Sequence, residues 1–158
     1  MTTQPTTKAS ILTDIMLAVF RVNGRLLEKG DQMVEPLNLT SARWQVLGAV
    51  SLSGKALTAP QVAEAMGITR QGAQKQLNTL EKEGFLVQLK NPRHERSPLY
   101  APTKLGTQTI SATMSLQKAW ANKLSAGLSL QDLRSTLETL NAVYVELDSP
   151  VPTKGAKS

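Results

Sequence analysis

The chain has 158 residues, of which 41% are hydrophobic, and this suits one domain with a real core. Only 4% are aromatic, so the core must be mainly aliphatic, and a mainly α fold is favoured over a β-sandwich. The net charge of +6 suggests nucleic acid or an anionic membrane as partner, and the absence of cysteine excludes disulfides, thiol chemistry and cysteine-based zinc sites.

The chain shows no sequence signal for membrane insertion or export. Its apolar runs are shorter than the roughly 20 residues that a membrane-spanning helix needs, and residues 1–10 are mostly polar. We therefore expect a soluble, cytoplasmic protein that forms a single domain. Residues 1–7 and 149–158 are expected to be disordered, because polar residues, proline and glycine dominate them.

Residues 10–29 have the periodicity of an amphipathic helix. Its apolar residues recur at intervals of three and four positions: Leu12, Ile15, Met16, Val19, Val22 and Leu26. Gly30 and Asp31 are expected to end this helix. Thr40 and Ser41 then suit the N-cap of a short helix on which Trp44 shares an apolar face with two aliphatic residues.

Two short helices are predicted between residues 58 and 83. Thr58 and Gln61 form a capping box that starts the first, which ends at Gly67. Thr69 can cap the second, whose inner face is apolar. Their close succession is typical of a helix-turn-helix.

The second of these helices has a polar and basic outer face near its N-terminus. A recognition helix presents this end to the base edges of DNA. Arginine can donate two hydrogen bonds to guanine, and glutamine can pair with adenine. The alternative is an ordinary solvated helix face. The candidate DNA-binding residues are Thr69, Arg70, Gln71, Gln74, Lys75 and Asn78.

Residues 85–89 and 99–101 are short β-compatible runs on either side of a charged loop. Lys90, Arg93 and Arg96 lie in or beside this loop and could reach phosphates or the minor groove. The hairpin is therefore interpreted as a wing. His94, the only histidine, is interpreted as a surface residue rather than as a metal ligand or pH sensor, so no metal site is expected.

The last two helices are expected to start after Thr103 and at Ser129. The final helix carries a narrow apolar stripe with 3-4-3-4-3 spacing, formed by Leu130, Leu133, Leu137, Leu140, Tyr144 and Leu147. With Leu12, Ile15 and Val19 of the first helix, this stripe predicts packing between helices. The pattern leaves open whether they pack within one chain or across a subunit boundary.

The sequence resembles the MarR (multiple antibiotic resistance regulator) family of bacterial transcription regulators over most of its length. The residues that carry the resemblance, in matching order and spacing, are Leu39-Thr40, Leu57-Thr58, Val62-Ala63, Gly67-Ile68, residues 80–86, Asn91-Pro92, Arg96 and residues 103–106. The resemblance implies a winged helix-turn-helix lobe at residues 39–103. It also implies a helical dimerisation region at residues 8–38 and 104–148.

The resemblance further implies a homodimer that binds a pseudo-palindromic operator in double-stranded DNA and represses transcription. Arg96 takes the position of the family's minor-groove arginine, and Arg93 is a second candidate. His94 stands where many relatives carry aspartate, so the resemblance does not carry over the ion pair that usually orients the wing. Glu95 is a candidate substitute for that aspartate.

Many members of the family also release DNA when a small aromatic ligand binds. Trp44, Trp120 and Arg21 are candidates for such a pocket, although the two tryptophans are also readily explained as core residues.

The same patterns bear on two other classes of protein. A winged helix can be a protein–protein interaction module, but the basic face favours DNA. An enzyme would need a nucleophile with a base, a glycine-rich phosphate loop or paired acids with a histidine, and the sequence offers none of these. We therefore expect a DNA-binding regulator that is not an enzyme and uses no cofactor.

Overall fold

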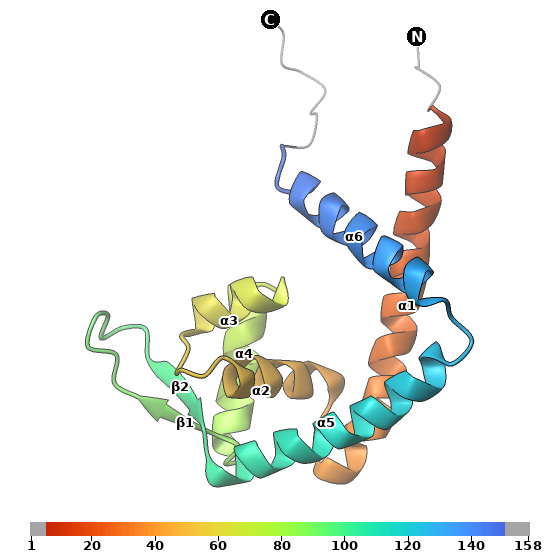
Figure 1. Cartoon of the computed structure of the whole chain (residues 1–158). Coiled ribbons are helices and arrows are strands. Elements are labelled where there is room, and N and C mark those ends of the chain that lie inside the picture. Colours follow the sequence, from red (N-terminus) through yellow and green to blue (C-terminus); the bar gives the residue numbers. More distant parts are fainter. Residues whose placement is uncertain (1–5, 151–158) are drawn as a thin grey trace, which may run out of the picture. The chain divides into compact units, whose positions relative to one another are not determined.

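The computed structural model describes residues 6–150 (Figure 1). In chain order its elements are α1 (Thr7–Val34), the 3-10 helix η1 (Glu35–Leu37), α2 (Ser41–Leu52), α3 (Ala59–Met66), α4 (Arg70–Lys82), β1 (Leu86–Leu89), β2 (Leu99–Pro102), α5 (Lys104–Ser125) and α6 (Leu130–Glu146). This mainly helical chain with one antiparallel hairpin confirms the expected fold class. The chain divides into two compact units, and the division falls between Gln117 and Lys118, inside α5.

Helix α1 is longer at both ends than its periodicity predicted. It begins at Thr7, because the hydroxyl of Thr6 accepts a hydrogen bond from the Ala9 N–H at 3.2 Å and caps the first turn. The helix therefore starts inside the segment expected to be disordered. Residues 1–5 of that segment, and residues 151–158 of the C-terminal one, lie outside the described residues.

Gly30 and Asp31 do not end α1, which continues to Val34. A Cβ atom at Gly30 would overlap the Oγ atom of Ser41, so glycine is needed for the close approach of α1 and α2. The Ser41 hydroxyl donates to the Leu27 carbonyl at 2.8 Å, and the Ser41 N–H donates to the Asp31 carboxylate at 2.5 Å. Asp31 thus caps the start of α2 instead of ending α1.

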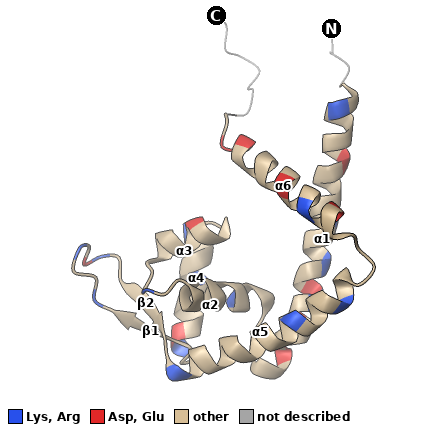
Figure 2. Cartoon of the chain, viewed as in Figure 1, with Lys and Arg blue, Asp and Glu red and all other residues tan. Residues whose placement is uncertain are grey.

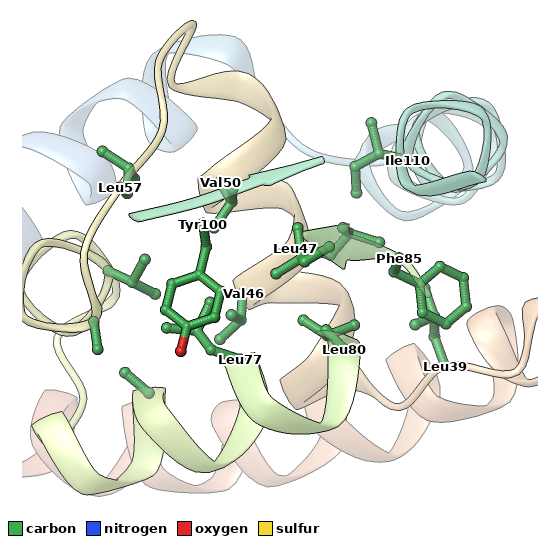
Figure 3. Close-up of a cluster of buried hydrophobic side chains, with 14 of the residues drawn as sticks. Leu39, Val46, Leu47, Val50, Leu57, Leu77, Leu80, Phe85, Tyr100 and Ile110 are labelled. Carbon is green, nitrogen blue, oxygen red and sulfur yellow. The ribbon is translucent and has the colours of Figure 1, made fainter. Parts of the chain in front are cut away.

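The core of the first unit lies between α2, α3, α4 and the hairpin. Val46, Leu47 and Val50 of α2 are buried together with Leu77 and Leu80 of α4 (Figure 3). Burying one such side chain contributes on the order of 1.5 to 3 kcal/mol, so this cluster holds the helix-turn-helix in place.

The second unit contains the end of α5 and the whole of α6. Helix α6 starts at the predicted place, and Ser129 caps it, because its hydroxyl accepts a hydrogen bond from the Asp132 N–H at 3.4 Å. Among the described residues, no helix has the length and apolar character to cross a membrane.

Candidate nucleic-acid interface

The turn between α3 and α4 has the geometry of a helix-turn-helix. Gly67 ends α3 in the left-handed conformation with φ of 61°, and the Ile68 N–H donates to the Ala63 carbonyl at 3.1 Å. The Gln61 side-chain oxygen accepts from the Thr58 N–H at 2.9 Å, which fastens the first turn of α3. The two helices pack through buried alanine, valine and leucine side chains.

The first turn of α4 is fixed by Thr69, whose hydroxyl accepts from the Gly72 N–H at 3.0 Å. Thr69, one of the residues predicted to contact DNA, is therefore also the N-cap of α4. Most of the predicted reading residues are exposed on α4: Arg70, Gln71, Lys75 and Asn78. Their charges and amides can reach an outside partner.

Gln74 differs from these neighbours because it is half-buried. Its Nε2 atom donates to the hydroxyl of Tyr100 at 2.8 Å and to the Oδ1 atom of Asn78 at 2.7 Å. The Tyr100 hydroxyl also accepts from Gln88 Nε2 at 3.3 Å. Tyr100 therefore joins the recognition helix to the wing.

Sequence reasoning missed this role of Tyr100, which it treated only as part of a β-compatible run. The side chain is fully buried and its hydroxyl points toward the helix that carries Leu77 and Leu80 (Figure 3). A buried tyrosine hydroxyl usually finds a hydrogen-bond partner. This rule predicts a hydrogen bond for a buried tyrosine hydroxyl, but it does not identify Gln74 as the partner.

The wing strands pair in antiparallel register, from Leu86 with Pro102 to Leu89 with Leu99. The hairpin is also attached to the connection between α2 and α3. Leu57 and Tyr100 exchange backbone hydrogen bonds of 3.0 and 2.8 Å. The position of the wing is thus fixed relative to the helix-turn-helix.

The conformation of the wing loop depends on Asn91, which is 8% exposed. Its Nδ2 atom donates to the Ser97 carbonyl at 2.7 Å, and its Oδ1 atom accepts from the Arg93 N–H at 3.1 Å. Sequence reasoning used Asn91 only as part of a family motif. An asparagine at the start of a loop often bonds to the backbone two residues on, which was the missed signal.

Glu95, the candidate substitute for the family's wing aspartate, forms no ion pair with the described residues. Between residues 6 and 150, the ion pairs are Arg25 with Glu28 and Arg43 with Glu83. A neutral amide network holds the loop instead. Lys90, Arg93 and Arg96 are exposed there, and Figure 2 shows the basic segments of this loop.

A hollow of about 530 Å³ lies between the wing loop and the start of α3. Its polar lining includes Lys55, Thr58, Gln61, Arg93 and His94, and no carboxylate of residues 6–150 lines it. The hollow therefore extends the basic surface of the wing. Within the described ranges, no three His, Cys, Asp or Glu side chains are grouped to hold a metal ion.

The base of the wing is attached to the start of α5. The Thr103 hydroxyl donates to the Gly84 carbonyl at 2.7 Å and accepts from the Gly106 N–H at 3.1 Å, so Thr103 caps α5 as predicted. A Cβ atom at Gly106 would overlap the carbonyl oxygen of Phe85. Only glycine lets α5 begin this close to the wing.

The predicted dimerisation residues lie on α1 and α6. Leu130 and Leu137 of α6 are 64% and 60% exposed, and Ile15 of α1 is half-buried. The remaining members are also exposed: Leu12, Val19, Leu133, Leu140 and Tyr144. Large apolar surfaces of this kind are uncommon on a monomer and mark interaction surfaces.

The three candidate ligand residues belong to different units, with Arg21 and Trp44 in the first and Trp120 in the second. Trp44 packs against the core of the first unit, as the core interpretation predicts. Arg21 is exposed on α1, and Trp120 is half-buried in the second unit.

The sequence of residues 37–97 matches the model of the MarR family. This segment spans α2, the helix-turn-helix and most of the wing. An uncharacterised protein of Mycobacterium tuberculosis is 34% identical over 134 residues, which cover 85% of this chain and 92% of that protein. The transcriptional activatory protein BadR of Rhodopseudomonas palustris is 24% identical over 136 residues, covering 84% and 78%.

Solved structures share the fold. CouR from Rhodococcus jostii, bound to p-coumaroyl-CoA, has a TM-score of 0.73 at 20% identity and covers 89% of this chain and 96% of its own. MepR of S. aureus, in complex with DNA, has a TM-score of 0.72 at 20% identity and covers 82% and 96%.

Proposed function

The chain belongs to the MarR family of transcription regulators, which bind DNA, and on this premise we propose that it is a homodimeric, sequence-specific repressor released by a small ligand. The observation that carries the proposal is the exposed basic surface of α4 and the wing. Tyr100 and Asn91 hold the two parts of this surface in a fixed arrangement.

In the proposed complex, α4 enters the major groove and the wing contacts the flanking backbone. Arg70, Gln71, Lys75 and Asn78 would read base edges, while Lys90, Arg93 and Arg96 would reach phosphates and the minor groove. The exposure of these side chains supports this assignment. The DNA complex of MepR, which shares the fold, supports it as well.

The proposed dimer brings two such surfaces to one operator. Recognition helices that bind half-sites one helical turn apart must lie about 34 Å from each other. The exposed leucine stripe of α6 and the apolar face of α1 support dimerisation, because a second copy would remove them from water. We assign the interface to these two faces.

Repression would follow because a dimer on the operator obstructs polymerase. The ligand is proposed to be a small aromatic molecule, and the p-coumaroyl-CoA bound to CouR supports ligand control. BadR is an activatory protein by its name, so the direction of regulation needs a direct test by transcription in vitro.

Selection of bound genomic DNA tests the proposed function. The purified full chain is incubated with sheared genomic DNA from its own organism, and the bound fragments are sequenced. We expect enrichment of a shared inverted repeat, and loss of that enrichment in the Arg93→Ala, Arg96→Ala double variant. Recovery of fragments without a common motif would contradict the proposal and favour an interaction module that does not read DNA.

A further inference from the structure

Both side-chain N–H groups of Gln74 are used inside the protein. One bonds to the Tyr100 hydroxyl at 2.8 Å and the other to Asn78 Oδ1 at 2.7 Å. A glutamine amide has two donor hydrogens and one acceptor oxygen. The oxygen of this amide has no hydrogen-bond partner among the described residues, so it is the atom that Gln74 can offer to an outside partner.

This arrangement changes which base Gln74 can recognise. Pairing with adenine through two hydrogen bonds requires the amide to donate to N7 and to accept from N6. Gln74 has no donor left, so that mode is closed to it. In the major groove, cytosine and adenine each offer an amino group, whereas guanine and thymine offer acceptors.

We propose that Tyr100 is a positioning residue that makes Gln74 an acceptor-only reader, selecting cytosine or adenine at one operator position. This inference rests on the proposed function, since it requires α4 to lie in the major groove. The residue types alone would not predict this base preference.

The arrangement is rigid because Tyr100 cannot move easily. Its side chain is fully buried, and its backbone is paired with Leu57 on one side and with Gln88 of β1 on the other. If Gln74 turned toward a base, the buried hydroxyl would lose a hydrogen bond, and an unsatisfied buried group costs free energy. Asn78 lies one helical turn further along α4, and its Oδ1 atom accepts the second hydrogen bond from the Gln74 amide.

The test is selection from a library of duplexes with randomised half-sites, using the full chain and three variants. Gln74→Ala identifies the base position that this residue reads. The wild-type chain should select cytosine or adenine there. Gln74→Glu, which offers only acceptors at the same reach, should keep this preference.

Tyr100→Phe removes the hydroxyl and frees one donor of Gln74. At the identified position, guanine and thymine should then be accepted, and discrimination against them should fall on the order of tenfold. Gln88→Ala is the matched control, because it removes the other partner of the hydroxyl and leaves Gln74 in place. It should select the same bases as the wild type.

The outcomes separate this inference from the proposed function. If no duplex is enriched at all, the proposed function fails. If duplexes are enriched but the wild type selects guanine or thymine, the inference is wrong. It is also wrong if Gln74→Ala alters no position, or if a folded Tyr100→Phe variant selects as the wild type does. The Gln74 variants keep the test decisive if Tyr100→Phe unfolds, because they remove no core side chain and leave the bond from Gln88 to the Tyr100 hydroxyl in place.

Discussion

Replacing Asn91 by alanine removes the network that shapes the wing loop without removing any proposed DNA contact. Asn91 is 8% exposed and its amide faces the loop backbone. The variant loses the hydrogen bond that Asn91 donates to the Ser97 carbonyl at 2.7 Å. It also loses the one that Asn91 accepts from the Arg93 N–H at 3.1 Å. The wing arginines stay in the chain but are no longer held in one arrangement.

The size of the effect follows from these two hydrogen bonds. Each contributes a net of about 0.5 to 1.5 kcal/mol, so the ordered loop loses about 1 to 3 kcal/mol relative to its disordered forms. If DNA binding requires the ordered loop, affinity falls by up to the same amount, which is about 5- to 150-fold in Kd.

Fluorescence anisotropy with a labelled operator duplex measures this loss in Kd. Ser97→Ala is the control within the same loop, because Asn91 bonds to the Ser97 carbonyl and not to its hydroxyl. The control should bind as the wild type does. If Asn91→Ala binds within twofold of the wild type while Arg96→Ala is weakened, the loop does not need this network and the reasoning is refuted.

The remaining predictions concern the wing, the dimer and the junction with α5. Arg96→Ala should weaken operator binding by about 1 to 3 kcal/mol in the same titration while the dimer stays folded, and unchanged affinity would remove Arg96 from the interface. Leu137→Glu combined with Leu140→Glu should give monomers or unfolded chains in analytical ultracentrifugation, because charges cannot be buried in an apolar seam. Gly106→Ala should lower the free energy of unfolding in urea by about 1 to 3 kcal/mol, because its Cβ atom would overlap the Phe85 carbonyl oxygen.

Two control variants make the last two predictions specific. Ser135→Glu combined with Ala142→Glu adds the same charge to α6 away from the leucine stripe, and it should remain dimeric. A Cβ atom at Gly127 would meet no atom of the described residues within 4 Å, so Gly127→Ala should leave stability near that of the wild type. If the leucine variant remains dimeric, the interface lies elsewhere on the chain. If Gly106→Ala is as stable as the wild type, the contact between the start of α5 and the Phe85 carbonyl can relax.

The starts of helices could be predicted from the sequence because capping is local. Thr40, Thr69 and Ser129 each accept a hydrogen bond from a backbone N–H three residues on, so the pattern and its cause lie within one turn. The prediction that Gly30 ends α1 was wrong because glycine occurs both at helix ends and where two helices cross closely. Only the position of Ser41 on the next helix distinguishes these two uses.

The contacts that organise the site were beyond the reach of sequence patterns. Gln74 and Tyr100 are 26 residues apart, and their contact exists only after the wing has folded against α4. The candidate role of Glu95 fails for a related reason. The Asn91 amide holds the loop, and the choice between an amide and an ion pair depends on the path of the loop.

The salt dependence of operator binding tests the central claim most directly. The affinity of the full chain for a selected duplex is measured between 50 and 200 mM salt, a range in which each neutralised phosphate contributes about −0.9 to the slope of log affinity against log salt. A DNA-binding regulator of this kind should show a steep negative slope. Removing a wing arginine that contacts a phosphate should make the slope shallower by about one unit. Weak binding that does not change with salt, or that is equal for unrelated sequences, would contradict the claim.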